Sequence, residues 1–111
     1  MKMNEYQTLS MRTMPKDDVR EVLNNYGLGL CGESGEVADL IKKKLHHSHK
    51  TISVDDFKNE LGDVLHYVAG IATILNISLE DVANANLEKL RERYPNGFNP
   101  EDSMKRVDTN K

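Results

Sequence analysis

The feature that most limits what this chain can fold into is a long stretch without proline, between Pro15 and Pro95. Proline interrupts helices and marks the turns of sheet-rich proteins, so its absence over such a length favours long helices. Apolar residues recur at every third or fourth position through the same stretch, which is the spacing of an amphipathic helix. The sequence therefore predicts an all-α fold.

Start and stop signals divide the chain into four expected helices, at about residues 4–14, 17–45, 53–75 and 78–94. A serine followed three residues later by an aspartate can satisfy free N–H groups in a first helical turn, and such a pair opens the third and the fourth helix. Asp17 or Asp18 is expected to do the same for the second helix. Asn76 is expected to end the third helix, and Pro95 with Gly97 breaks the fourth.

The chain is expected to form one domain over residues 1–98, followed by a polar tail at 99–111. Its 111 residues at 12.6 kDa are enough for one hydrophobic core and too few for two. The last residues are polar and aperiodic, which is typical of a loose chain end.

Charge and composition exclude several classes of protein. Lys and Arg total 15 against 18 for Asp and Glu, a net charge of -3 with both signs interleaved, whereas nucleic-acid-binding domains usually carry a clustered basic excess. The longest mainly apolar stretch, Val68 to Leu75, is far shorter than the roughly 20 residues that span a bilayer. Cys31 is the single cysteine, so no intramolecular disulfide is possible, and we expect it to be a small buried residue. We therefore expect a cytoplasmic protein that binds neither nucleic acid nor a membrane.

Acidic side chains occupy helix faces where a purely structural sequence would carry leucine. Glu33 falls near the middle of the apolar stripe of the second helix, and Glu36 lies on its edge. Glu60 and Asp63 share a flank of the third helix with apolar residues. Each pair is spaced i to i+3 and so points from one face, and the four carboxylates would converge if the two helices pack antiparallel.

Four converging carboxylates need positive charge, because two like charges about 4 Å apart repel by roughly 4 kcal/mol at an effective dielectric of 20. A divalent cation supplies that charge. A set of ligands made of oxygen alone favours Mg²⁺, or Mn²⁺ in its place, over zinc. Lys89 and Arg93, one turn apart on the fourth helix, lie where they can receive phosphate oxygens, with Asn86 at the margin of the same apolar stripe.

Beyond the metal site, the order of these motifs resembles the MazG-type nucleoside triphosphate pyrophosphohydrolases. The pattern is ESGE, then 23 residues, then ELGD, then a segment NxxKLxxRYPxGF. The similarity runs from Tyr6-Gln7 through LGLCGESGEVADLIKK and NELGDVLHYVAGIA to ANLEKLRERYPNGF. It is lost in the loop near residues 46–52 and in the tail.

The resemblance implies an all-α enzyme that splits a nucleoside triphosphate into the monophosphate and pyrophosphate, in nucleotide-pool sanitation or control. It implies that magnesium is bound by Glu33, Glu36, Glu60 and Asp63. It further implies that the fourth helix contacts phosphates or sugar through Asn86, Lys89 and Arg93. Of the carboxylates, Glu36, with Glu33, is expected to orient or deprotonate the attacking water.

An oligomer is expected for a physical reason as well as by resemblance. The second helix would have about 28 residues and a length of about 42 Å, which is longer than a compact globule of this size is wide. A homodimer or homotetramer would cover its ends, so we expect a four-helix bundle completed by homo-oligomerisation. The resemblance also implies pockets that borrow residues from a neighbouring subunit.

Two other interpretations stay open. Phosphoribosyl-ATP pyrophosphatases are similar bundles, although the RYPxGF ending favours the first interpretation. A catalytically silent helical interaction module is a third possibility, disfavoured because the four carboxylates occur together with Asn86, Lys89 and Arg93. The histidines at 46, 47 and 49 are expected to lie in an exposed polar turn, and His66 on a helix surface or between subunits.

Overall fold

The computed structural model describes residues 1–106, and this part of the chain is helical, with no strand. Its elements are α1 (Met3–Ser10), the 3₁₀ turn η1 (Met11–Thr13), α2 (Val19–His46), α3 (Val54–Ile74), α4 (Leu79–Arg93) and α5 (Pro100–Lys105). The predicted all-α class is confirmed. The four predicted helices correspond to α1 with η1, α2, α3 and α4.

The predicted serine caps of α3 and α4 are confirmed. Asp56 N–H donates to Ser53 Oγ at 3.4 Å, and Ser53 N–H donates to Asp56 Oδ2 at 2.8 Å, which makes a capping box. Ser78 Oγ accepts from the N–H of Asp81 at 3.0 Å. Asn76 follows α3 with a φ of 59°, a left-handed conformation that asparagine tolerates and that ends the helix.

Two local predictions were wrong. Asp18 stands at the N-cap of α2 but makes no side-chain cap; its own N–H donates to Asp17 Oδ1 at 2.7 Å. The polar tail was expected to be irregular, yet α5 forms within it because Asn99 Oδ1 accepts from Asp102 N–H at 2.8 Å and Pro100 occupies the first turn. Residues 107–111 of that tail lie outside the described residues.

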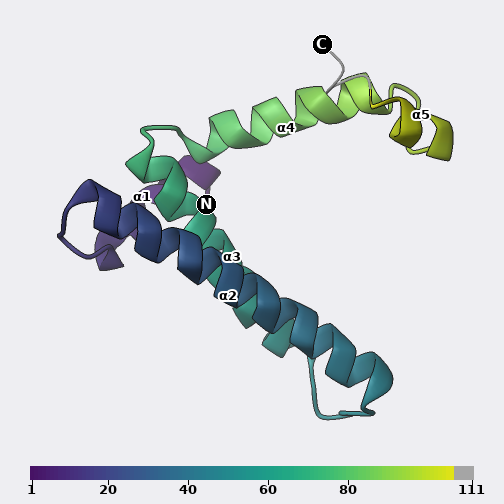
Figure 1. Cartoon of the computed structure of the whole chain (residues 1–111), viewed down its shortest axis with the longest axis horizontal. Helices are drawn as coiled ribbons and strands as arrows, with labels where there is room; N and C mark the ends of the chain where they lie inside the picture. Colours follow the sequence, from purple (N-terminus) through teal and green to yellow (C-terminus); the bar gives the residue numbers. More distant parts are fainter. Residues whose placement is uncertain (107–111) are drawn as a thin grey trace.

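The hairpin of α2 and α3 is the main packing unit, and its helices run antiparallel (Figure 1). Two tyrosine–glycine contacts lock their register. A Cβ atom built on Gly70 would overlap the Tyr26 ring, and one built on Gly29 would overlap the Tyr67 ring. The two rings also meet edge to face, with centroids 5.1 Å apart. Because only glycine lets a ring lie directly on the opposing backbone, these four positions fix how far one helix is shifted along the other.

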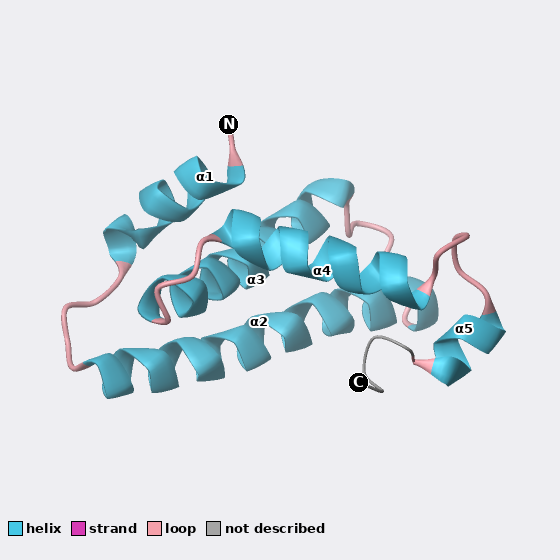
Figure 2. Ribbon diagram, turned by 90° about the horizontal axis from the view of Figure 1, so that it is seen from above, coloured by secondary structure: helices cyan, strands magenta, loops and turns pink. Residues whose placement is uncertain are grey.

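The buried core is small and lies between α3, the start of α4 and α1, which is on the side of α3 away from α2 (Figure 2). Ala69, Ala72 and Leu79 form its centre, with Tyr6 and Met11 packed against them from α1 and η1. Away from this core, the predicted apolar stripes are only partly buried in the single chain. Apolar residues of the expected helices that stay exposed in the single chain include Val19, Ile41, Leu61, Leu75, Val82, Leu87 and Leu90.

The single chain is open in shape, because α4 departs from the hairpin at the α3–α4 bend instead of packing along it (Figure 1). Its radius of gyration is 17.0 Å, against about 13 Å for a compact chain of this length. Its accessible surface is 8306 Å², against about 6,200 Å² for a folded monomer of this mass. The chain therefore leaves uncovered surface that a compact monomer would bury.

Within the described residues, no helix alone has the length and apolar character needed to cross a membrane. The pair α3 and α4 reaches that length together, but the chain bends by 103° between them.

Candidate metal centre

The register of the hairpin brings the two acidic motifs face to face. Tyr26 lies against Gly70, and Gly29 lies against Tyr67. Moving three residues forward along α2, from Tyr26 to Gly29, therefore matches moving three residues back along α3, from Gly70 to Tyr67. A further four residues along α2 leads to Glu33, and four residues back along α3 leads to Asp63. The packing of aromatic rings on glycines therefore sets which carboxylates meet.

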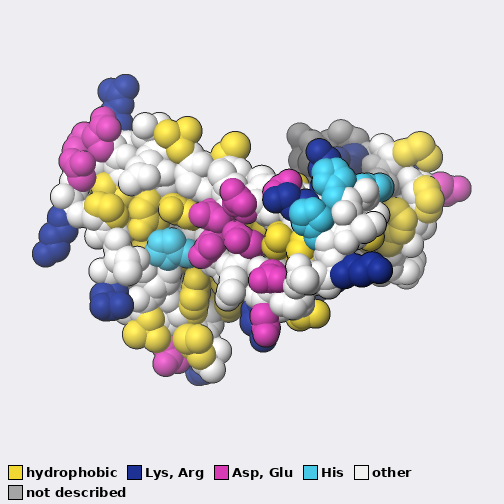
Figure 3. Space-filling model, turned by 90° about the horizontal axis from the view of Figure 1, so that it is seen from below, with side chains coloured by type: hydrophobic (Ala, Val, Ile, Leu, Met, Phe, Trp, Pro, Cys, Tyr) yellow, Lys and Arg dark blue, Asp and Glu magenta, His cyan; other side chains and the backbone are white. Residues whose placement is uncertain are grey.

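Three of the four predicted carboxylates form one cluster. Glu33, Glu60 and Asp63 each offer an oxygen, and these oxygens all lie within 4.8 Å of one another. Glu33 and Glu60 are half-buried and Asp63 is exposed, so the cluster opens to solvent on one side. In Figure 3, acidic side chains gather near the middle of one face, with hydrophobic side chains beside them.

The carboxylates of the cluster crowd one another, and the effect is seen at Glu60. The pKa of Glu60 is raised above its ordinary value of 4.5, first because burial removes water, and then because of the charges of Glu33, Asp63 and Glu36. A side-chain hydrogen bond with Glu33 raises it further. Among the described residues, no lysine or arginine forms an ion pair with the cluster. The site therefore carries excess negative charge in the folded chain.

The donor set fits a hard divalent cation. Mg²⁺ takes carboxylate oxygens at about 2.0–2.1 Å, which places neighbouring ligand oxygens about 3–4 Å apart. The oxygens of the cluster, all within 4.8 Å of one another, are close to that spacing. No histidine or cysteine belongs to the cluster, so its chemistry matches magnesium or manganese better than zinc.

Glu36 stands apart from the other three predicted ligands. It is exposed and is not a member of the cluster, but its charge reaches Glu60 and contributes to the raised pKa there. It lies one turn beyond Glu33 on the same face of α2. The structure thus groups three of the predicted ligands and leaves the fourth beside them.

The structure does not bring the predicted substrate residues of α4 to this cluster within one chain. The helix packs against α1, α3 and α5 and makes no close approach to α2. Asn86 and Lys89 are exposed, while Arg93 is half-buried with its guanidinium 5.8 Å from the Tyr94 ring centroid. The α4 side chains and the metal cluster therefore belong to two separate surfaces of the single chain.

His66 lies one turn after Asp63 and has a defined environment that the sequence did not indicate. Its Nδ1 is 2.6 Å from Ser10 Oγ, and its ring packs against those of Tyr26 and Tyr67. The contact ties α1 to the hairpin next to the cluster. Ser10 has no sequence signal, because only the crossing of α1 over α3 brings it there.

The solvent exposure of the loop histidines and of Cys31 tests two further predictions from the sequence. The histidines at 46, 47 and 49 are exposed, as predicted, with the rings of His47 and His49 6.2 Å apart. Cys31 was expected to be buried and is exposed, because it lies on the face of α2 that α3 does not cover.

Comparison with known proteins gives two matches. Residues 22–98 match the family model of the MazG nucleotide pyrophosphohydrolase domain. The Gene 37 protein of Mycobacterium phage L5 is 41% identical over 83 residues, which are 72% of this chain and 73% of the phage protein. No solved structure gives a significant match.

The matched range contains all of the hairpin except the first three residues of α2, and it includes the three clustered carboxylates, Glu36 and the whole of α4. The family match and the geometry thus select the same part of the molecule. This chain belongs to the MazG nucleotide pyrophosphohydrolase domain family.

Proposed function

We propose that this protein hydrolyses a nucleoside triphosphate to the nucleoside monophosphate and pyrophosphate, with Mg²⁺ as the metal. The observation that carries the proposal is the cluster of Glu33, Glu60 and Asp63, which lies inside the family-matched segment and forms no ion pair with a lysine or arginine of residues 1–106. Water adds across the α–β phosphate linkage: the P–O bond of that linkage breaks, and pyrophosphate leaves.

The clustered carboxylates, with Glu36 beside them, would hold the magnesium. When bound, the metal neutralises charge on the triphosphate and lowers the pKa of a water molecule. Glu36 is exposed and outside the cluster, so it is the carboxylate with most freedom to orient that water or accept its proton. Glu33, one turn away, supports the same role.

Asn86, Lys89 and Arg93 would bind phosphate or sugar oxygens of the substrate. Two cationic side chains one turn apart on α4 suit a polyphosphate, because each can meet a different oxygen of the chain. In this proposal the two surfaces meet in the assembled protein, where α4 of one copy adjoins the metal cluster of another.

The assembly we propose is a homodimer or homotetramer. The apolar stripe of α4 is uncovered in the single chain, with Val82, Leu87 and Leu90 between 39% and 48% exposed. The surface in excess of a compact monomer, about 2,000 Å², is of the size that obligate oligomers bury. Multi-angle light scattering on a sizing column tests it: a mass of 12.6 kDa would contradict the assembly.

Release of pyrophosphate tests the reaction. The purified chain is incubated with canonical and modified nucleoside triphosphates, with Mg²⁺ and with EDTA, and both products are measured. We expect equal amounts of pyrophosphate and monophosphate, abolished by EDTA. The ranking of substrates would then indicate whether the protein controls a canonical pool in the cytoplasm or removes damaged nucleotides.

Failure on every nucleoside triphosphate would contradict the proposal. Phosphoribosyl-ATP is the next substrate to test, because it carries the same type of linkage. Absence of turnover there as well would leave the non-catalytic helical module.

A further inference from the structure

The first turn of α4 is capped largely by side chains that come from α1. Leu79 N–H donates to Gln7 Oε1 at 2.8 Å, and Glu80 N–H donates to Asn4 Oδ1 at 3.0 Å. The next free N–H, that of Asp81, is taken locally by Ser78. Free N–H groups at a helix start normally depend on a neighbouring residue of the same segment. In α4, two of these three N–H groups are bound by residues more than 70 positions away in the sequence.

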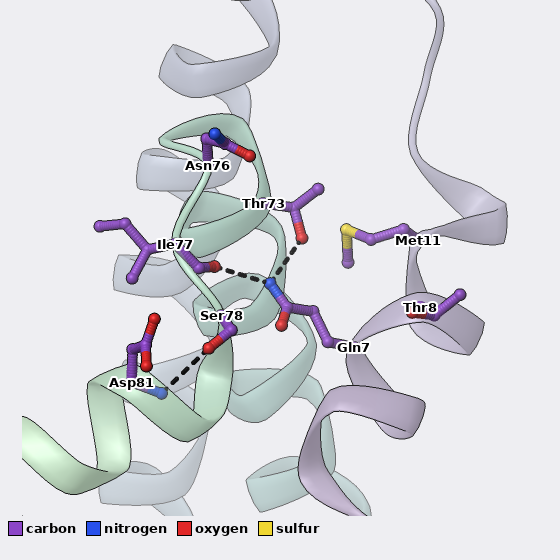
Figure 4. Close-up of a pocket in the computed structure, with 8 residues that line it drawn as sticks. All are labelled: Gln7, Thr8, Met11, Thr73, Asn76, Ile77, Ser78 and Asp81. Carbon is purple, nitrogen blue, oxygen red and sulfur yellow. Dashed lines mark hydrogen bonds between the residues drawn. The ribbon is translucent and has the colours of Figure 1, made fainter.

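The same two amides also donate to residues in or beside the α3–α4 bend, the segment 75–78 between the two helices. Gln7 Nε2 donates to the carbonyl oxygen of Ile77 and to Thr73 Oγ1, both at 3.0 Å. Asn4 Nδ2 donates to the Glu80 carboxylate at 3.0 Å. Figure 4 shows the Gln7 side chain extending from α1 toward Thr73 and Ile77, in an open pocket of about 540 Å³. Each amide therefore uses both its oxygen and its nitrogen, Gln7 at the bend and the start of α4, and Asn4 at Glu80 in the first turn of α4.

In the single chain, the described residues give α4 few other contacts that fix its direction. The chain bends by 103° between α3 and α4, and every residue from 80 to 92 is exposed. Leu79 alone is buried, in the core under α1. The buried side chain of Leu79 fixes the position of the start of α4 but not the direction of its axis. The paired amide contacts of Asn4 and Gln7 constrain that direction.

The length of α4 amplifies any error at the bend. Lys89 lies ten residues beyond Leu79, or about 15 Å along the helix. A rotation of about 4° at the bend would thus move it by about 1 Å, and a misplacement of that size can cost on the order of 100-fold in rate. A small loss of constraint near Gln7 is enough to displace the substrate residues.

We propose that Asn4 and Gln7 are positioning residues, which set the direction of α4 and so place Asn86, Lys89 and Arg93 for the substrate. This inference rests on the proposed function for the role of α4 and goes beyond it. The family match begins at residue 22, so it assigns no role to α1. The metal cluster uses α2 and α3 only, so metal binding is expected to be independent of both amides.

The kinetic test uses Gln7→Ala and Asn4→Ala in the full chain, with Glu5→Ala as an exposed control on the same helix. We expect KM for the triphosphate to rise about tenfold or more in both variants, with the Mg²⁺ concentration for half-activity changed less than twofold. The control should match the wild type. An unchanged KM, or an equal rise in the Mg²⁺ requirement, would overturn the inference.

A second test exchanges the amide and the carboxylate of the Asn4–Glu80 contact and asks whether substrate affinity is restored. Asn4→Asp places a carboxylate against that of Glu80. The repulsion between the two should raise KM as Asn4→Ala does. Adding Glu80→Gln gives that position an amide that can donate to the new carboxylate, so the double variant should recover most of the affinity. If the double variant remains as weak as the single one, the contact does not position the helix. This pair also serves if Gln7→Ala fails to fold.

A distance measurement separates this inference from the proposed function. Cys31 is exposed on α2, and Glu88→Cys adds a second exposed label site on α4. Spin labels at the two sites should give a narrow distance distribution in the parent and a broader or shifted one with Gln7→Ala. The result needs no turnover. An unchanged distribution would overturn the positioning role, whereas an inactive parent would count against the proposed function alone.

Discussion

The α2–α3 hairpin and the α4 helix are held in different ways. In the hairpin, tyrosine rings lie on glycines of the opposing helix, so packing sets the register of the two acidic motifs. In the single chain, the α4 helix is fixed at its first turn, chiefly by polar contacts with α1, and its residues 80–92 are exposed. Packing along a whole interface tolerates the loss of one contact, whereas a helix anchored at one end does not.

The largest expected effect concerns the metal cluster of the hairpin. Glu60→Gln should lower pyrophosphate release about 100-fold or more, since metal charge stabilisation is lost. Without metal the same variant should unfold at an equal or higher temperature, because it removes a carboxylate with a raised pKa. Melting curves with Mg²⁺ and with EDTA check both statements, and Glu21→Gln on α2 is the matched control. A lower melting temperature without metal would mean that the carboxylate has a structural role.

The next effect concerns the register of the hairpin. Gly70→Ala should destabilise the fold by about 1–3 kcal/mol, because the new methyl overlaps the Tyr26 ring. Gly27→Ala is the control, since that position of α2 is open and alanine favours a helix by up to about 1 kcal/mol. Urea unfolding gives both values. Equal effects at the two sites would show that ring packing does not lock the register.

A smaller effect is expected on α4. Leu87→Ala should cost about 2 kcal/mol if a second copy covers the side chain. The loss should depend on protein concentration, and the population of monomer should increase in light scattering. In a lone chain, where Leu87 is 48% exposed, the substitution would change stability by less than about 0.5 kcal/mol. Glu88→Ala, at the next position, controls for the change in helix propensity.

The smallest effect is a pH dependence. A raised pKa at Glu60 stabilises the metal-free fold below the ordinary value of 4.5, and this contribution is lost as pH rises through the raised value. Metal binding requires the ionised carboxylate, so the affinity for Mg²⁺ increases as pH rises through the same range. The difference in melting temperature between Mg²⁺ and EDTA should therefore grow from pH 4.5 to 7. A difference that stays constant with pH would exclude Glu60 as a ligand.

Most of the fold and part of the candidate site could be predicted from the sequence. Helix ends at Ser53, Asn76 and Ser78 depend on neighbouring residues, and those predictions are confirmed. The clustering of Glu33 with Glu60 and Asp63 followed from their spacing once an antiparallel hairpin was assumed. The α5 helix was missed because its cap at Asn99 stands in a segment without apolar periodicity.

The remaining features depend on contacts between residues far apart in the chain. Neighbouring residues determine where a helix forms, where it ends and which of its faces carries acidic side chains. These properties are local and follow from residue spacing and capping. The register that joins the acidic faces needs Tyr26 to meet Gly70, and the direction of α4 needs Gln7 to meet Leu79. Such pairs leave no periodic trace in the sequence, because what matters is which surfaces come together in three dimensions and not which residues are neighbours.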